Sequence, residues 1–410
     1  MGRRRLIAGA ALVSAGLAAC GADDTVTPLP RAICSPIITA AGASPDLLVV
    51  ADMPRRGRAG DAGIAASEAV RLTLARKGLR AGEHRLGFQA CDDSTSSAGS
   101  YDQERCAKNG RAYASNPAVV GVIGPMQTLC AARLIPGASR RGLAVVSPSA
   151  TGTSLTMIGA GVSPAQFAEI HPTGRQTFFR VAPPDAEQAR VAVALFRREG
   201  AKRLFAAREP TDYGASLEAA LRTEAARAGI EVLPTAVWSL VGKSARELAR
   251  RARAAGADGA HLSGVWQNGG AQTAAALRSE LGPAVPIVGS DGFVLGLPPE
   301  VSREAEGMWV TVPGLTPARL PPAGKEIVRE VGTGPPPTLG SPYAAAATEL
   351  LLDAIAASDG SRAEVVRELR QARVTSGPVG PMRFDRHGDP VPRHVDLYRM
   401  RDGAVLPEDR

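Results

Sequence analysis

The chain alternates short runs of aliphatic residues with longer runs in which apolar residues recur at helical spacing. Short aliphatic runs are typical of buried strands, and the longer runs are typical of amphipathic helices. In the first part of the chain this pattern predicts strands at 47–51, 84–90, 119–123 and 144–146, and helices at 62–77, 101–115 and 130–140. After Pro183-Pro184-Asp185 it restarts and predicts strands at 203–206, 231–237, 261–264 and 286–289, with helices at 186–199, 215–228, 244–255 and 271–281. Such alternation indicates an α/β fold with two doubly wound parallel-sheet lobes.

The last part of the chain departs from this alternation. We expect a strand at 308–312, an irregular proline-rich stretch at 313–337, and two helices at 343–357 and 362–372. Residues 382–385 and 398–400 are expected to pair around the turn His387-Gly388-Asp389-Pro390. Because these helices follow two complete α/β sets, the chain should cross back to the first lobe.

The first twenty residues combine a basic start, Arg3-Arg4-Arg5, with an apolar run at 6–17 and the sequence Leu17-Ala18-Ala19-Cys20. The apolar run is too short to span a membrane and is typical of a signal peptide. The segment around Cys20 resembles the processing site of bacterial lipoproteins, which predicts lipidation of Cys20. Residues 21–44 are rich in Pro, Ala, Thr and Gly and predict a flexible tether.

Composition changes this picture little. Hydrophobic residues make up 44% and charged residues 21% of the 410 residues, as in a globular protein. The net charge is +8, but the arginines are dispersed and only five of the 48 basic residues are lysines, so we expect no nucleic-acid partner. None of the five histidines lies in a nucleophile or metal motif, so we expect neither an enzyme nor a metal or other cofactor.

Four cysteines remain once Cys20 is set aside, namely Cys34, Cys91, Cys106 and Cys130. In an exported protein an even number favours two disulfides, with three connectivities open. The pairing of Cys91 with Cys106, which leaves Cys34 with Cys130, is our first expectation. The pairing of Cys91 with Cys130 is nearly as well supported.

Candidate ligand contacts lie in the loops that follow the predicted strands, where open α/β sheets bind ligands. Thr128, Ser149 and Thr151 follow two first-lobe strands and offer hydroxyls and main-chain N–H groups suited to a carboxylate. Asp291, between small residues in Gly289-Ser290-Asp291-Gly292, supplies an acceptor for an ammonium group. Tyr213 and Trp266 place aromatic rings at the ends of two other strands. Together these groups describe a site for a zwitterion.

The order and spacing of these motifs resemble a known family. The matching stretches are Cys91-Asp92-Asp93, Gly121-Val122-Ile123-Gly124, Val146-Ser147-Pro148-Ser149-Ala150-Thr151, Asp212-Tyr213-Gly214, Gly289-Ser290-Asp291-Gly292, and 380–389. Over residues 45–400 the chain resembles a type I periplasmic binding protein of the branched-chain amino acid (Leu/Ile/Val-binding) class, the receptor of an ABC transporter.

The resemblance implies two lobes joined by three crossings, which we place near 182, 313 and 376. Lobe 1 would then be 45–182 plus 313–375, and lobe 2 would be 183–312 plus 376–410. It also implies that Thr128, Ser149 and Thr151 hold the ligand carboxylate and part of its ammonium group. Asp291 would bind the ammonium group from lobe 2, and Tyr213 would close over the ligand. Gln188 and Trp266 are further lining candidates. The implied partner is an ABC permease, and a monomer is expected.

Two alternatives stay open. The same lobes could serve a ligand-sensing receptor subunit instead of an importer. Arg55-Arg56-Gly57-Arg58 stands in the first strand-to-helix loop, where relatives often carry small residues and an aromatic. These arginines either line the rim of the site or extend its specificity to a small acid or amide.

Overall fold

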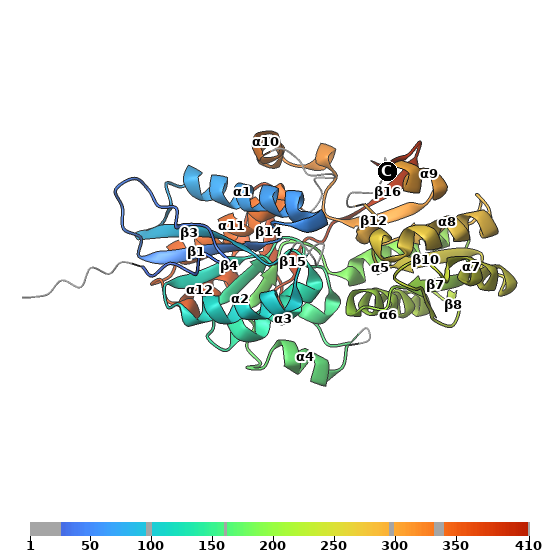
Figure 1. Cartoon of the computed structure of the whole chain (residues 1–410), viewed down its shortest axis with the longest axis horizontal. Coiled ribbons are helices and arrows are strands. Elements are labelled where there is room, and N and C mark those ends of the chain that lie inside the picture. The colour runs from blue at the N-terminus through green and yellow to red at the C-terminus, as the bar shows by residue number, and fades with distance from the viewer. Residues whose placement is uncertain (1–25, 96–100, 160–161, 295–298, 332–339, 409–410) are drawn as a thin grey trace, which may run out of the picture.

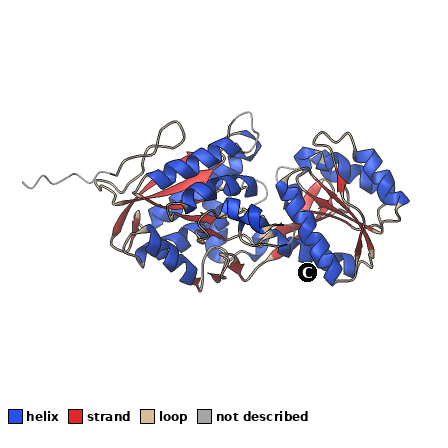
Figure 2. Ribbon diagram, turned by 90° about the horizontal axis from the view of Figure 1, so that it is seen from below, coloured by secondary structure: helices blue, strands red, loops and turns tan. Residues whose placement is uncertain are grey.

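The computed structural model describes residues 26–95, 101–159, 162–294, 299–331 and 340–408. The predicted signal peptide and Cys20 lie outside this part of the chain. Two α/β lobes lie side by side along the long axis of the molecule (Figure 1). In each lobe, helices flank the strands on both faces (Figure 2), so the predicted fold class is confirmed. Among the described residues, no helix has the length and apolar character needed to cross a bilayer.

The sheet of the first lobe has the order β2-β3-β1-β4-β5-β6. Its strands are β1 (Leu47–Met53), β2 (Arg80–Ala81), β3 (His84–Asp92), β4 (Val119–Ile123), β5 (Ala144–Ser147) and β6 (Phe178–Arg180). Only the β2–β3 pair is antiparallel among these described neighbours. Strands β4 and β5 are buried along their whole length, as expected for parallel strands covered on both faces.

Helices cover both faces of this sheet. They are α1 (Gly60–Arg76), α2 (Gln103–Ser115), α3 (Thr128–Ser139), α4 (Pro164–Ile170), α10 (Pro322–Val331), α11 (Ser341–Ala356) and α12 (Arg362–Gln371), with 3-10 turns η1 (Gly57–Ala59) and η2 (Thr153–Leu155). One core cluster contains residues of α1 and α11, and a second contains residues of α2 and α3. Helix α10 corrects the expectation of an irregular stretch at 313–337, because Pro322 suits a first helical turn and Ile327 is buried in the core.

The second sheet has the order β17-β16-β12-β11-β10-β7-β8, and β9 also pairs with β7. Its strands are β7 (Arg203–Arg208), β8 (Glu231–Val232), β9 (Ala236–Val237), β10 (Gly259–Ser263), β11 (Ile287–Gly289), β12 (Trp309–Pro313), β16 (Val395–Arg401) and β17 (Ala404–Pro407). The single strand expected at 231–237 is divided into β8 and β9, with Pro234, which has no N–H to donate, between them. Strands β16 and β17 are antiparallel additions at one edge.

The second lobe is covered by α5 (Asp185–Arg198), α6 (Asp212–Arg227), α7 (Ala245–Ala254), α8 (Gly270–Leu281) and α9 (Pro299–Glu304), with 3-10 turns η3 (Trp266–Asn268) and η4 (Asp291–Phe293). A further 3-10 turn, η5 (Pro317–Arg319), follows β12. Residues of α7 and α8 share one core cluster, and residues of α5 and α6 share another. The two faces of this sheet are therefore packed independently, as in the first lobe.

The chain passes between the sheets after β6, after β12 and before β16. A small sheet of β13 (Arg373–Val374), β14 (Met382–Phe384) and β15 (Pro390–Val391) precedes the last passage. Its residues Met382 and Phe384 are buried in the first-lobe core, and the Phe384 ring lies 5.0 Å from that of Phe179.

The expected third crossing near 376 is therefore wrong, because residues up to 391 pack on the first lobe and the return begins at Val395. The expected pairing of 382–385 with 398–400 is wrong as well. Strand β14 pairs with β15 across the predicted turn, and residues 398–400 pair with β12 and β17.

The segment 26–44 packs against the first lobe and is not a flexible tether there. Val26 and the buried Leu29 contact the core, and the Leu29 main-chain N donates to Gln89 Oε1 over 2.8 Å. Cys34 and Ile38 make antiparallel bridges with residues of β3. The segment supplies hydrogen-bond partners at a sheet edge, which its Pro- and Ala-rich composition did not reveal.

Both predicted disulfides form, with a connectivity that corrects our expectation. Cys34 pairs with Cys91, and Cys106 pairs with Cys130. Cys91 is drawn to Cys34 because the N-terminal segment lies along β3. Cys106 and Cys130 lie in the first turns of α2 and α3, which pack together. Neither proximity can be read from sequence spacing.

Candidate functional site

Two loops of the first lobe carry the predicted carboxylate-binding residues and hold each other in place. The main-chain N of Gly152 donates to Thr128 Oγ1 over 3.0 Å, and Ser149 Oγ donates to the carbonyl of Met126 over 3.0 Å. A Cβ at position 152 would lie 2.2 Å from Thr128 Cγ2, so this approach requires glycine. The structure therefore brings Thr128, Ser149 and Thr151 into one group at the carboxyl ends of β4 and β5.

In the second lobe, three predicted residues are directly bonded. Asp291 Oδ1 accepts from Gln188 Nε2 over 2.9 Å and from the Tyr213 hydroxyl over 2.5 Å. Gln188 Oε1 accepts in turn from the Asp291 main-chain N over 3.1 Å and from Thr311 Oγ1 over 2.9 Å. Gln188 is fully buried and uses both ends of its amide, so its role is to fix Asp291.

Asp185 links the two lobes, and sequence reasoning missed it as part of a linker. It is the first residue of α5, and its carboxylate accepts from Gln188 Nε2 over 2.8 Å, with the Thr151 side chain near enough to act against the rise of its pKa. Its main-chain N donates to the Thr151 carbonyl over 2.8 Å. A continuous polar chain thus runs Thr151–Asp185–Gln188–Asp291, from one lobe to the other.

The electrostatics of this chain favour a cation. Burial, followed by the charge of Asp291, raises the pKa of Asp185 from 3.8 to about 7. Burial also raises the pKa of Asp291, although hydrogen bonds from Tyr213 and Gln188 oppose the shift. Two carboxyl groups in a dry site repel each other when both ionise, and an ammonium group between them would relieve that repulsion.

Tyr101 and Glu209 lie in a second region where the two lobes approach each other, and the sequence analysis did not single them out. Burial raises the pKa of Tyr101, in the first lobe, to about 12, and the charges of Glu209 and Asp212 in the second lobe add to the shift. Buried Glu209 accepts from the Val265 main-chain N over 3.2 Å and from Asn268 Nδ2 over 3.1 Å. Because these bonds fix the loop that carries Trp266, Glu209 has a structural role.

The remaining predicted contacts are placed less directly. Trp266 begins η3 and packs beside the second-lobe core. In the arginine loop, Arg56 Nε lies 3.3 Å from Asp92 Oδ2, and the Arg55 main-chain N donates to the same carboxylate. Asp92 therefore draws part of this loop toward β3, and the Arg55 side chain stays exposed.

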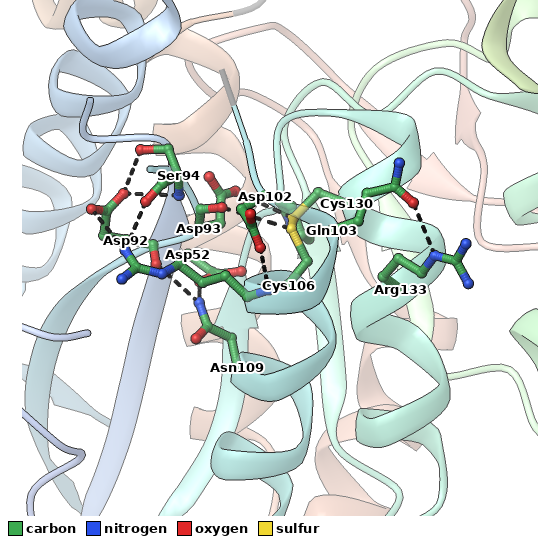
Figure 3. The surroundings of a disulfide bond; sticks show 12 residues. Asp52, Asp92, Asp93, Ser94, Asp102, Gln103, Cys106, Asn109, Cys130 and Arg133 are labelled. Atoms are coloured by element: carbon green, nitrogen blue, oxygen red, sulfur yellow. Dashed lines mark hydrogen bonds and ion pairs between the residues drawn. A yellow bond between two sulfur atoms is a disulfide. The ribbon is translucent and has the colours of Figure 1, made fainter. Parts of the chain in front are cut away.

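Acidic side chains, among them Asp93 and Asp102, also lie around the Cys106–Cys130 disulfide (Figure 3). Burial raises the pKa of Asp52 to about 6, and it raises the pKa of Asp93 well above its usual value. Asp93, Cys106 and Cys130 bring potential metal-ligand atoms within 4.8 Å of one another. Both sulfurs are in a disulfide, however, and provide no thiolate for a metal ion.

The class of protein that this structure defines is a two-lobed α/β solute receptor. Its two sheets are joined by three passages of the chain, and the polar chain Thr151–Asp185–Gln188–Asp291 runs between the lobes. A family model described as periplasmic binding protein matches residues 53–404, and the chain belongs to this family. The resemblance to type I periplasmic binding proteins is thereby confirmed. None of the curated proteins matches the sequence.

Solved structures share the fold. An ABC transporter substrate-binding protein from Desulfitobacterium hafniense in complex with Leu has 22% identity and a TM-score of 0.69, covering 88% of this chain and 99% of that one. A leucine-binding protein from Thermotoga maritima has 19% identity and a TM-score of 0.71, with 88% and 98% covered. A solute-binding protein from Rhodopseudomonas palustris in complex with p-hydroxybenzoic acid has 14% identity and a TM-score of 0.72, with 89% and 96% covered.

Proposed function

We propose that this chain is the lipid-anchored, extracytoplasmic receptor of an ABC importer and binds an amino acid, branched-chain or similar, between its lobes. The observation that carries the proposal is the polar chain Thr151–Asp185–Gln188–Asp291. It offers hydroxyl and main-chain donors from one lobe and two carboxyl groups from the other. This is the complement of an α-carboxylate and an α-ammonium group.

A small aromatic acid is the second candidate ligand. Neighbours of the same fold are described in complex with benzoate and hydroxybenzoates, and Arg55 and Arg56 stand near the first-lobe loops. The acidic pair Asp185 and Asp291 argues against it, because an anion placed there would meet like charge unless a proton were taken up.

A calorimetric screen tests the ligand class. L-leucine, L-isoleucine, L-valine and 4-hydroxybenzoate would be titrated into the purified chain at pH 8. Binding of an aliphatic amino acid that is at least tenfold tighter than binding of the aromatic acid supports the proposal. The reverse order would replace it with the aromatic-acid reading.

The proposed mechanism is closure of the two lobes on the ligand. Two rigid lobes joined by three passages can rotate, and a ligand that contacts both stabilises the closed state by those extra contacts. Small-angle scattering should therefore give a smaller radius of gyration with saturating ligand. Identical curves would contradict closure.

The proposed anchor is a lipid on Cys20. Since Val26 already packs on the first lobe, residues 21–25 are the whole spacer, spanning at most about 20 Å. Labelled palmitate should enter the wild-type protein, and Cys20→Ala should lose both the label and membrane retention. Release of unlabelled wild-type protein into the medium would exclude the anchor.

The partners follow from the same proposal. A monomer delivers its ligand to an ABC permease in the membrane, with no enzymatic step, no cofactor and no nucleic acid. A sensing role uses the same lobe closure, so the discriminating test is genetic. Deletion of the gene should abolish uptake of the labelled ligand. Intact uptake with loss of a ligand-dependent response would instead favour sensing.

A further inference from the structure

Arg180 carries a fully buried guanidinium at the end of the edge strand β6. Its Nη1 donates to the carbonyls of Ala150, over 3.1 Å, and Gly152, over 2.8 Å. Its Nε donates to Asp389 Oδ1 over 2.7 Å. A desolvated charge is tolerated only where its donors are satisfied and a counter-charge is present, and Arg180 has both.

Asp389 belongs to the motif Arg386-His387-Gly388-Asp389, for which ligand binding alone gives no reason. The carboxylate is fully buried, and its Oδ2 accepts from the Thr156 hydroxyl over 3.2 Å. Thr156 Oγ1 accepts from Arg180 Nη2 over 2.6 Å, so the three side chains form a closed ring. Residues 382–391 form the β14–β15 hairpin. It approaches β6 closely at Gly388, which has a φ of +83° and where a Cβ would lie 2.5 Å from the Phe178 carbonyl oxygen.

We propose that Arg180 and Asp389 are positioning residues for the loop at residues 150–152, which carries Thr151. Through these two side chains, the β14–β15 hairpin holds that loop in place. The two carbonyls that Arg180 holds flank Thr151, and the Thr151 carbonyl itself accepts from Asp185. Rotation of residue 151 is therefore restricted on both sides. This inference rests on the proposed function in so far as Thr151 contacts the ligand.

Arg393, two residues after the β14–β15 hairpin, connects this hairpin to the second lobe. Its Nη2 lies 2.6 Å from Asp385 Oδ2 and 3.7 Å from Asp389 Oδ2, and its Nη1 lies 3.3 Å from Glu187 Oε1 on α5. Helix α5 also carries Gln188, which fixes Asp291. The hairpin thus supports both halves of the site from the side of the passages between the lobes.

The test compares two arginines that both hold main-chain carbonyls in the first lobe. Arg180→Lys keeps the charge but loses the planar fork that holds two carbonyls, Thr156 and Asp389 together. Arg362→Lys is the matched control, because Arg362 holds the carbonyls of Tyr113, Ala114, Asn116 and Val119 at the opposite end of β4. Three quantities would be measured for each variant: hydrogen exchange of residues 147–153 without ligand, melting temperature, and calorimetric affinity for L-leucine.

Both variants should melt at a lower temperature than the wild type. Only Arg180→Lys should speed exchange in 147–153, and it should weaken L-leucine binding about 10- to 100-fold. Equal exchange and equal affinity in the two variants would overturn the inference. If wild-type protein binds no L-leucine, the proposed ligand fails, and exchange alone still decides the positioning role. Should Arg180→Lys not fold, Thr156→Val keeps the ion pair and must still raise exchange in 147–153 for the inference to stand.

Discussion

Replacement of Asp291 by asparagine isolates the charge that the proposed ligand needs. Asparagine has the same shape, and its Oδ1 can still accept from Gln188 and Tyr213, which both bond to Oδ1 of Asp291 in the native protein. Alanine would instead leave both donors without an acceptor. The substitution therefore removes a charge and leaves the local hydrogen bonds in place.

The magnitude follows from the partial burial of Asp291 and from its two hydrogen bonds. Removing one partner of a buried hydrogen-bonded charge pair costs about 2–5 kcal/mol, or roughly 30- to several-thousand-fold in affinity. Asp185 offsets part of that loss. Burial and the charge of Asp291 raise its pKa to about 7, so at pH 8 Asp185 is largely ionised and still offers a carboxylate to the ligand ammonium group. We therefore expect the lower half of the range, about 30- to 300-fold weaker L-leucine binding.

The assay is calorimetry with L-leucine at pH 8, with a melting curve to show that each variant is folded. Asp212→Asn is the matched control, since Asp212 lies at the start of α6 in the same lobe but is exposed. It should change affinity less than threefold, because solvent screens an exposed charge. The reasoning is refuted if Asp291→Asn binds L-leucine as tightly as the wild type, or if the two variants lose affinity equally.

Four further outcomes are expected. Burial raises the pKa of Asp185 from 3.8 to about 7, so between these pH values the folded state binds a proton that the unfolded chain has lost. The stability that this proton gives the folded state is complete below about pH 4 and is lost as the pH rises through 7. Asp185→Asn should therefore raise the melting temperature more at pH 8 than at pH 5, and an equal change at both pH values would contradict the shift. In the wild type, L-leucine affinity should rise from pH 5 to 8 as the pair ionises, whereas affinity that falls over this range would indicate an anionic ligand. Gly152→Ala should weaken L-leucine binding at least tenfold, because its Cβ would lie 2.2 Å from Thr128 Cγ2. A crystal structure of the variant with Thr128 in its original position, together with unchanged affinity, would count against this. The Cys34→Ser, Cys91→Ser double variant should lose about 4 kcal/mol in urea unfolding, since the bond closes a loop of 57 residues, with L-leucine affinity unchanged; an unaltered urea midpoint would show that packing alone holds the N-terminal segment.

The elements that the sequence predicted best are those in which burial and local propensity agree. Strands β4 and β5 are aliphatic and buried throughout, so their pattern can be read without knowledge of their neighbours. The N-terminal segment failed for the opposite reason. Leu29 and Cys34 are isolated apolar residues among prolines and alanines, and only contact with β3 gives them a buried environment.

The residues of the candidate site also fall into those that could be predicted from the sequence and those that could not. Thr151, Tyr213 and Asp291 could be found because strand ends of a parallel sheet converge on one edge. Asp185 and Arg180 could not, because each acts on a loop that lies distant in the sequence. Arg180 contacts residues 150 and 152 and also Asp389, separated from it by 209 positions. A pattern within one segment carries no sign of such a pair.

The placement of Asp185 also bears on why the ligand should be a zwitterion. In this structure the Asp185 main-chain N donates to the Thr151 carbonyl, so a ligand carboxylate that takes the Thr151 hydroxyl comes to lie next to the Asp185 carboxyl group. The ligand carboxylate then meets the buried Asp185 and the partly buried Asp291, two groups that carry negative charge when ionised. A ligand with only a carboxylate cannot offset that cost, whereas an α-amino acid brings an ammonium group a few ångströms from its carboxylate. Since Asp185 lies directly after the first passage between the lobes, the proposed ligand contact also lies where the lobes are expected to move. Ligand recognition and lobe closure are therefore expected to be one event, and a ligand that lacks either charge should fail at both.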